Sequence, residues 1–298
     1  MPFAHVNGVD LYYETGGEGV PAVYIHGGYP SLASTLQDFS QWNWTWENDL
    51  ASSLHFIWYD RRGCYRSSMP PSGYDLENQA KDLTELLDTL HIPSAHVIGS
   101  SAGGPISLML AALFPDRVLS LTLDGTGIDL FPVGDPVRDL IHQLIMILQQ
   151  EGAEAAYAKR PAGVETSLGP LWLADEMRAC GEYAEFQEEQ QRLARQAQTM
   201  SMSARARYFA TELRSMQASM RNDLPDYARR VTCPTLVLHG NEDRVAPRTW
   251  SLELAELIPT ACMQSLAGVG HNPIAISAEG RRALLDFIQQ TDERAIRL

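Results

Sequence analysis

The chain has 298 residues, of which 45% are hydrophobic and 20% charged, and its formal net charge at pH 7 is −14. This composition is typical of a folded chain with a sizeable core, and the length suits one large domain or a domain with an insertion. The negative balance argues against nucleic acid or an anionic membrane as the main partner.

The amino-terminal residues and the cysteines argue against several other classes of protein. Residues 1–6 lack a basic region followed by an apolar run, and no stretch approaches about 18 uncharged apolar residues. Neither a signal peptide nor a membrane-spanning helix is expected, so the expected location is the cytoplasm. The four cysteines show no Cys-x-x-Cys spacing, which argues against a structural zinc site or a disulfide framework.

The order of the predicted elements indicates the fold class. Asn7-Gly8 is a hairpin turn signal, and strands alternate with helices after it. We expect strands at residues 3–6, 10–14, 20–26, 55–60, 95–98, 118–123, 235–239 and 261–266. We expect helices at residues 76–90, 101–114, 250–258 and 277–290. This order predicts an α/β fold with a mostly parallel eight-stranded sheet and helices on both faces.

Residues 130–230 interrupt this alternation. They contain no convincing strand, and helical segments are expected at about 135–150, 152–159, 174–200 and 204–221. We interpret the stretch as a helical cap inserted after the sixth strand, with residues 1–129 and 231–298 forming the core domain. Its middle is acidic and arginines follow, with Glu188 and Arg192 four residues apart, which favours a solvated helix face.

A Gly-x-Ser-x-Gly motif lies between a predicted strand and a predicted helix. It consists of Gly99, Ser100, Ser101, Ala102 and Gly103. A sharp strand-to-helix turn lifts the serine hydroxyl clear of the backbone and points the first N–H groups of the helix at the same place. The close approach of strand and helix requires Gly99 and Gly103 to be small. The placement of the motif indicates that Ser101 is a nucleophile.

A serine nucleophile needs a general base, and the base needs a group that orients it. Loops at the carboxyl ends of parallel strands converge, so the candidates follow predicted strands. Asp243 follows the strand at 235–239, and His271 follows the strand at 261–266. The order Ser101, Asp243, His271 is the one expected for a triad on this kind of sheet. Asp124, which ends the strand at 118–123, is the alternative acid.

The glycine pair after the third predicted strand is the expected second half of the site. A tetrahedral intermediate carries a negative oxygen that is best met by preorganised backbone N–H groups. We expect one N–H from Ala102 and the other from Gly28, with Tyr29 as the alternative donor. The other interpretation of Gly27-Gly28 is an ordinary tight turn.

Charged groups near this glycine turn are interpreted as structural. His26 opens the turn and is expected to hold it by hydrogen bonding rather than to move protons. Asp60, Arg61 and Arg62 follow the next strand and are expected to form a turn that braces the glycine loop.

Together these residues resemble the α/β-hydrolase fold family over nearly the whole chain. The resemblance implies that residues 26–28 form the oxyanion loop, residues 99–103 the nucleophile elbow and residues 130–230 the helical cap or lid. Residues 59–67 resemble the Asp-x-Arg-Gly-x-Gly-x-Ser loop of capped members, including prolyl aminopeptidases, with Tyr65 in place of the second glycine. The serine nucleophile excludes the epoxide hydrolase and haloalkane dehalogenase branches, which need an aspartate there.

These features predict a serine hydrolase that acts on a small-molecule carboxylic ester or lactone without metal or cofactor. The alternatives are an aminopeptidase, a cofactor-free perhydrolase, a carbon–carbon bond hydrolase and, outside enzymes, a ligand receptor with a vestigial triad. Tyr29, Ser100 and Trp172 are candidate substrate contacts. Met200, Met202, Met216 and Met220 either form an apolar lining or belong to ordinary core packing. Trp42, Trp44 and Trp46 either line a pocket or are simply buried. The sequence leaves the oligomeric state open.

Overall fold

The computed structural model describes residues 2–36 and 45–297, and all structural statements concern these residues. Eight strands form one sheet in the order β1-β2-β4-β3-β5-β6-β7-β8. The pairs β1–β2 and β2–β4 are antiparallel, and all other neighbours are parallel. The strands are β1 (Phe3–Val6), β2 (Val9–Gly16), β3 (Pro21–Ile25), β4 (His55–Tyr59), β5 (Ala95–Ser100), β6 (Val118–Asp124), β7 (Thr235–Gly240) and β8 (Ala261–Leu266). The predicted α/β sheet is confirmed.

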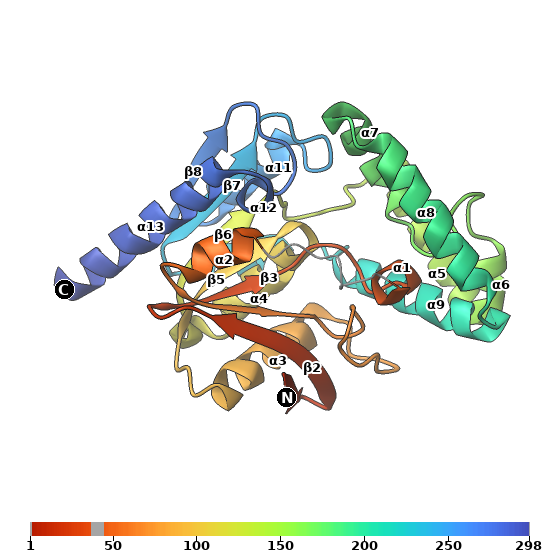
Figure 1. Cartoon of the computed structure of the whole chain (residues 1–298), viewed down its shortest axis with the longest axis horizontal. Coiled ribbons are helices and arrows are strands. Elements are labelled where there is room, and N and C mark those ends of the chain that lie inside the picture. Colours follow the sequence, from red (N-terminus) through yellow and green to blue (C-terminus); the bar gives the residue numbers. More distant parts are fainter. Residues whose placement is uncertain (1, 37–44, 298) are drawn as a thin grey trace.

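Helices cover both faces of this sheet, so the core has three layers (Figure 1). Strand β3 illustrates why, since Val23 and Ile25 belong to one apolar cluster and Ala22 and Tyr24 to the other. The first cluster includes side chains of α3 (Leu76–Thr89), α4 (Gly104–Leu113), α10 (Leu224–Ala228) and α11 (Arg248–Leu257). The second includes side chains of α2 (Thr45–Ala51), α12 (Pro273–Ile276) and α13 (Ala278–Arg297).

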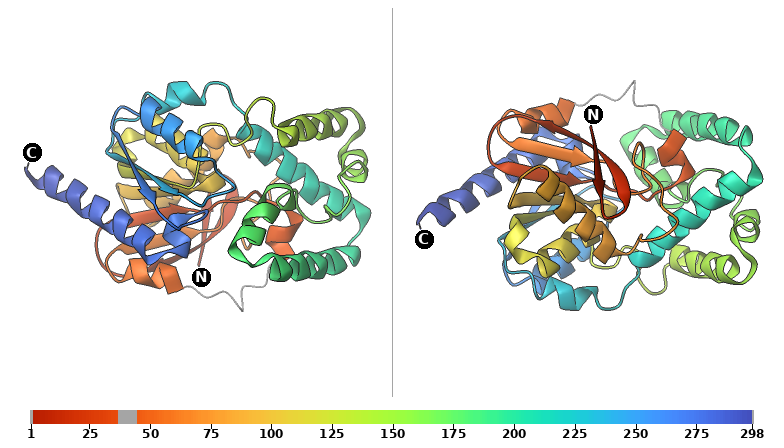
Figure 2. Two further views of the ribbon diagram at one scale, coloured as in Figure 1. Left: turned by 90° about the horizontal axis from the view of Figure 1, so that it is seen from above. Right: turned by 90° about the horizontal axis from the view of Figure 1, so that it is seen from below.

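Five helices between β6 and β7 form a separate group, which we call the helical insert (Figure 2). They are α5 (Pro136–Glu151), α6 (Ala153–Ala158), α7 (Pro170–Cys180), α8 (Tyr183–Gln198) and α9 (Met202–Ala218). A third apolar cluster joins α5, α6 and α9. The short helix α1 (Leu32–Leu36) lies beside α8 and α9. The division of the chain into a core domain and a cap domain at residues 130 and 230 stays a prediction.

The structure corrects three expectations about the insert. The single helix expected at 174–200 is two helices, because Gly181 has a φ of +84° and ends α7 in the left-handed conformation. Arg192 pairs with Glu189, three residues away, rather than with Glu188. The acidic stretch is also not wholly solvated, since Glu176 is buried.

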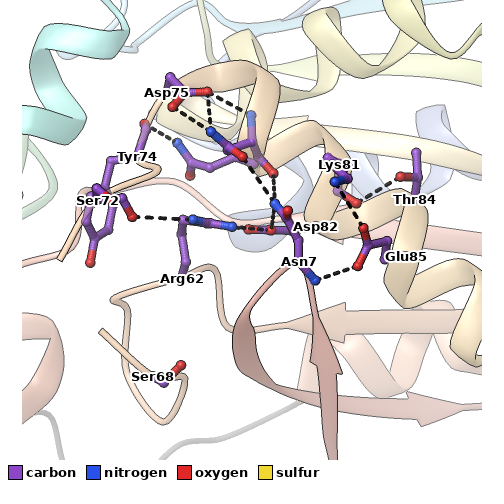
Figure 3. A network of polar contacts seen from close by, with 12 residues as sticks. Asn7, Arg62, Ser68, Ser72, Tyr74, Asp75, Lys81, Asp82, Thr84 and Glu85 are labelled. Carbon is purple, nitrogen blue, oxygen red and sulfur yellow. Dashed lines mark hydrogen bonds and ion pairs between the residues drawn. The ribbon is translucent and has the colours of Figure 1, made fainter. Parts of the chain in front are cut away.

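A polar network fixes the hairpin of β1 and β2 and the loop after β4 onto α3 (Figure 3). The buried Arg62 guanidinium binds both carboxylate oxygens of Asp82, with its Nε 2.6 Å from Oδ2. The Nδ2 of Asn7 donates to Asp82 as well, over 2.8 Å. Because the charge of Asp82 is paired and its oxygens accept several hydrogen bonds, the network can hold these segments in one arrangement.

No helix within residues 2–36 and 45–297 is long and apolar enough to cross a lipid bilayer. Trp42 and Trp44 lie outside the described residues, so the expectation about them is not tested.

Candidate active site

The Gly-x-Ser-x-Gly motif forms a tight turn between β5 and α4. Strand β5 ends at Ser100, and a 3-10 turn over Ser101–Gly103 leads into the helix. Ser101 has a φ of +48°, in the left-handed region that costs a non-glycine residue about 1–3 kcal/mol. The Thr126 hydroxyl donates to the Ser101 carbonyl over 2.7 Å and helps to hold this conformation. Ser101 therefore sits at a strained corner, as the motif predicts.

The two motif glycines are required by close packing. A Cβ atom on Gly99 would lie 2.1 Å from Ser107 Oγ, and one on Gly103 would lie 2.2 Å from the Ile25 carbonyl oxygen. Both distances are far shorter than a van der Waals contact, so each position excludes a side chain. A Cβ on Gly27 would likewise lie 2.8 Å from Ser101 Cβ, which places the glycine loop directly beside the serine.

His271 and Asp243 meet at the ends of neighbouring strands β8 and β7. The Nδ1 of His271 lies 2.8 Å from Asp243 Oδ2. The other carboxylate oxygen, Oδ1, accepts the backbone N–H groups of Val245 and Ala246, each over 2.8 Å. The Asp243 side chain is fully buried, so these bonds fix its direction. When Nδ1 donates to this carboxylate, Nε2 of the neutral ring is left to accept a proton.

Asp124, the alternative acid, has a different environment. Its Oδ1 accepts the Ile274 N–H over 3.4 Å, and its buried Oδ2 has no hydrogen-bond partner among the described residues. Burial raises the pKa of Asp124 to about 7. The histidine ring is hydrogen-bonded to Asp243 and not to Asp124, which favours Asp243 as the orienting acid.

The glycine loop after β3 is oriented by His26 and Arg61. His26 Nδ1 is 2.7 Å from the Gly27 carbonyl oxygen, and its Nε2 accepts the Arg61 N–H over 3.1 Å. The Arg61 guanidinium donates to the carbonyls of both Gly27 and Gly28. In a trans peptide the N–H points opposite to the carbonyl, so the N–H groups of Gly28 and Tyr29 point away from Arg61. Both remain candidate oxyanion donors.

His26 has the structural role expected from the sequence. Burial, reinforced by the positive charge of Arg61, lowers its pKa to about 3, so the ring is neutral at physiological pH. Tyr65, which replaces the second glycine of the family loop, packs against this ring with the centroids 5.0 Å apart. Its φ of +49° is in the left-handed region, so the tyrosine keeps the backbone conformation that glycine adopts easily.

A cavity of about 580 Å³ lies at this edge of the sheet. Four of its lining residues are those predicted as nucleophile, general base or oxyanion donors: Gly28, Ser101, Ala102 and His271. Tyr29 and Trp172, two of the candidate substrate contacts, also line it. The loops that follow β3, β5, β6, β7 and β8 meet here, and we call them the catalytic edge.

Some sequence expectations about the cavity are not supported. Ser100 is fully buried, its hydroxyl donates to Asn272 Oδ1 over 2.8 Å, and it is not among the described residues that line the cavity. None of the four methionines expected as an apolar lining belongs to that set either. Met216 packs instead inside the helical insert, and Met202 is exposed.

Sequence reasoning missed Glu176, a buried side chain of helix α7. Its Oε1 accepts the His271 N–H and its Oε2 accepts the Arg244 N–H, each over 2.9 Å. A Cβ on Gly270 would lie 2.5 Å from Oε1, so a side chain at this position would displace the carboxylate. One carboxylate of the helical insert therefore binds the loops that carry both His271 and Asp243.

Known proteins resemble this chain over nearly its whole length. A proposed carbamate hydrolase of Yersinia enterocolitica is 31% identical, and the match covers 92% of this chain and 90% of that protein. A 2-hydroxymuconate semialdehyde hydrolase of Pseudomonas sp. strain CF600 is 27% identical, covering 97% and 94%. The crystal structure of an enol-lactonase from Burkholderia xenovorans LB400 superimposes with a TM-score of 0.64 at 24% identity, covering 97% and 100%.

A family model described as the alpha/beta hydrolase fold matches residues 21–276. This range runs from the start of β3 to the end of α12, and so includes the glycine loop, the serine turn, the helical insert and the loops of Asp243 and His271. The chain belongs to the alpha/beta hydrolase fold family.

Proposed function

We propose that the protein is a serine hydrolase that cleaves a carboxylic ester or lactone through an acyl-enzyme intermediate on Ser101. The observation that carries this proposal is the 2.8 Å contact between His271 and Asp243 at a cavity that Ser101 also lines. The strained serine, the oriented imidazole and the glycine loop are the parts that acyl transfer requires.

The proposed reaction begins when His271 Nε2 takes the proton of the Ser101 hydroxyl as the oxygen attacks the carbonyl carbon. The N–H groups of Ala102 and Gly28 stabilise the negative oxygen of the tetrahedral intermediate, with Tyr29 N–H as the alternative to Gly28. His271 then gives the proton to the leaving alcohol, and water releases the acyl group by the same route. Asp243 keeps the ring in the required orientation and stabilises its charged form.

Ester or lactone cleavage fits the names of several structural neighbours as well as the site. Among them are the enol-lactonase, an N-acyl homoserine lactone degrading enzyme (TM-score 0.62) and an esterase from Exiguobacterium antarcticum (TM-score 0.63). Tyr29, Phe131 and Trp172 give the cavity an aromatic wall that suits an acyl chain or a lactone ring.

A fluorophosphonate probe combined with a substrate panel tests the proposal. We expect the probe to attach to Ser101 in the parent, and Ser101→Ala to fold but lose about 10⁴–10⁶-fold in kcat. Short or medium acyl esters or lactones should be hydrolysed with a kcat/KM at least about 10²-fold above that of the matching aminoacyl anilides. Labelling of another serine would overturn the assignment of the nucleophile. Preferential cleavage of a proline anilide would favour an aminopeptidase.

A further inference from the structure

Acidic side chains are prominent among the residues that line the cavity. Five carboxylate side chains line it, and no Lys or Arg is among the described lining residues. The five are Glu47, Asp60, Asp135, Glu189 and Glu212. A substrate that carries a free carboxylate would find no Lys or Arg among these lining residues to bind it, whereas a cation would find carboxylate oxygens.

Among these carboxylates, Glu212 on α9 is distinguished by its neutral surroundings. Asp60 is paired with Arg66, and Glu189 is paired with Arg192. Glu212 is 1% exposed, and the groups that donate to it are the Ser167 hydroxyl and the Leu168 N–H. Both bind the same oxygen, Oε1, over 2.7 and 2.9 Å.

The second oxygen of Glu212, Oε2, is buried and has no hydrogen-bond partner in the described part of the chain. An unsatisfied buried oxygen typically costs about 1–3 kcal/mol, and an unpaired buried charge costs more. A cationic donor would give this oxygen a hydrogen bond and, once the carboxyl has lost its proton, would also pair its charge.

The aromatic residues on the same cavity suit a cation as well. The rings of Tyr29, Phe131 and Trp172 lie with their centroids 5.7–6.5 Å from one another. Tyr29 also lies near Glu212: burial is the main cause that raises the pKa of the phenol, and the Glu212 carboxylate adds to it. Aromatic faces attract ammonium groups, by about 0.5–2 kcal/mol depending on desolvation.

From this geometry we infer that Glu212 is a binding site for a protonated amine, whose N–H donates to Oε2. This inference rests on the proposed serine hydrolase function. The substrate is then an ester or lactone that also carries an ammonium group. Esters that carry a free carboxylate are poor substrates.

The ionisation of Glu212 gives this site a characteristic pH dependence. Burial raises the pKa of Glu212 to about 8, so without a cation beside it the carboxyl holds a proton at pH 7 and loses it by pH 9. Tyr29 faces it from the loop after β3 and stays neutral in this range, because burial raises the pKa of its phenol. Asp135 and Glu189 face the same cavity from the start of α5 and from α8, and Glu47 faces it from α2. Affinity for an alkylammonium ion should therefore rise between pH 7 and pH 9.

Calorimetric titration of the whole protein with hexylammonium, 1-hexanol and hexanoate tests the inference without any turnover. We expect hexylammonium to bind at least about tenfold more tightly than 1-hexanol, a difference of about 1.4 kcal/mol, and hexanoate to bind most weakly. The preference should grow from pH 7 to pH 9, where hexylammonium remains charged.

Two variants sharpen the test. Glu212→Gln keeps an acceptor for Ser167 and Leu168 and should abolish both the preference and its pH dependence, with 1-hexanol binding unchanged. Glu188→Gln, on the exposed face of α8, should change neither. Equal binding of hexylammonium and 1-hexanol by the parent, or tightest binding of hexanoate, would overturn the inference. If hexylammonium binds as expected but no ester is hydrolysed, the amine site stands and the proposed function fails.

Discussion

The catalytic edge and the helical insert reach the same cavity but are built differently. On the catalytic edge, both oxygens of Asp243 and both ring nitrogens of His26 are bound by groups of nearby loops. In the insert, Glu212 has a buried oxygen without a hydrogen-bond partner among the described residues. The polar groups of Asp243 and His26 are thus bound within the protein, whereas the second oxygen of Glu212 can still accept a hydrogen bond from a ligand. Changes at the edge should therefore lower kcat, and changes in the insert should alter KM and selectivity.

The largest effect is expected for Asp243, the acid of the proposed triad. Asp243→Asn should lower kcat by about 10⁴-fold, because an amide no longer fixes the tautomer of His271. Ester hydrolysis under saturating substrate measures this loss. Asp124→Asn is the matched control and should cost much less, since Asp124 is not hydrogen-bonded to the ring. A larger loss of kcat in Asp124→Asn than in Asp243→Asn would instead make Asp124, at the end of β6, the acid that orients His271.

A smaller effect is expected where the two regions meet, at Glu176. Glu176→Gln replaces one of two acceptors with a donor that faces a backbone N–H, which should cost about 1–2 kcal/mol in the positioning of the catalytic loops. We expect kcat to fall about 5- to 30-fold with little change in KM. Asp175→Asn, at an exposed neighbour on α7, should leave both constants unchanged. A rise in KM alone would place Glu176 in substrate binding instead.

In the insert itself, Trp172→Ala should raise KM and leave kcat nearly unchanged. The indole lines the cavity and packs on Phe131 with the ring centroids 5.7 Å apart, so its loss removes apolar contact with the acyl chain. We expect about a tenfold rise in KM for a medium-chain ester and a smaller rise for an acetate ester. Leu171→Ala, on the exposed side of the same helix, is the control. A large fall in kcat would contradict a pure binding role.

The smallest effect concerns stability. The native pKa of Asp124 is about 7, above the value of about 3.9 in an unfolded chain, so the native state keeps a proton that the unfolded state releases. Stability from this group is present at low pH and is lost as pH rises from about 4 to 7. Asn cannot ionise, so urea unfolding should show Asp124→Asn gaining at least about 1 kcal/mol relative to the parent between pH 5 and pH 8. A constant difference across this range would contradict the raised pKa.

The catalytic edge could be predicted because its signals are local in the sequence. Asn7-Gly8 marks the first hairpin, and the Gly-x-Ser-x-Gly motif marks the strained serine turn. Asp243 and His271 each follow a strand, and the convergence of parallel strands brings them together. Their assignment to a triad is still a prediction that the variants above test.

The contribution of the insert could not be predicted because it depends on how helices dock. A glutamate in a helix usually indicates a solvated face, yet Glu176 and Glu212 are both buried. A signal was present for each, since Trp172 and Glu176 are four residues apart, and Phe209 and Glu212 three apart. This spacing places each carboxylate on the apolar side of its helix. What each carboxylate then contacts is decided by segments distant in the sequence.

Because Glu176 binds the catalytic loops, amide hydrogen exchange in these loops can show how the insert is docked. The amide hydrogen of His271 is held by a side chain of α7, so it can exchange with solvent only when that contact opens. The Glu176 carboxylate also accepts the amide hydrogen of Arg244, so the two amides should exchange together. The protection of these two amides measures how tightly α7 is docked. A ligand that binds across the cavity and stabilises the docked α7 should slow both, even where no structural change is visible.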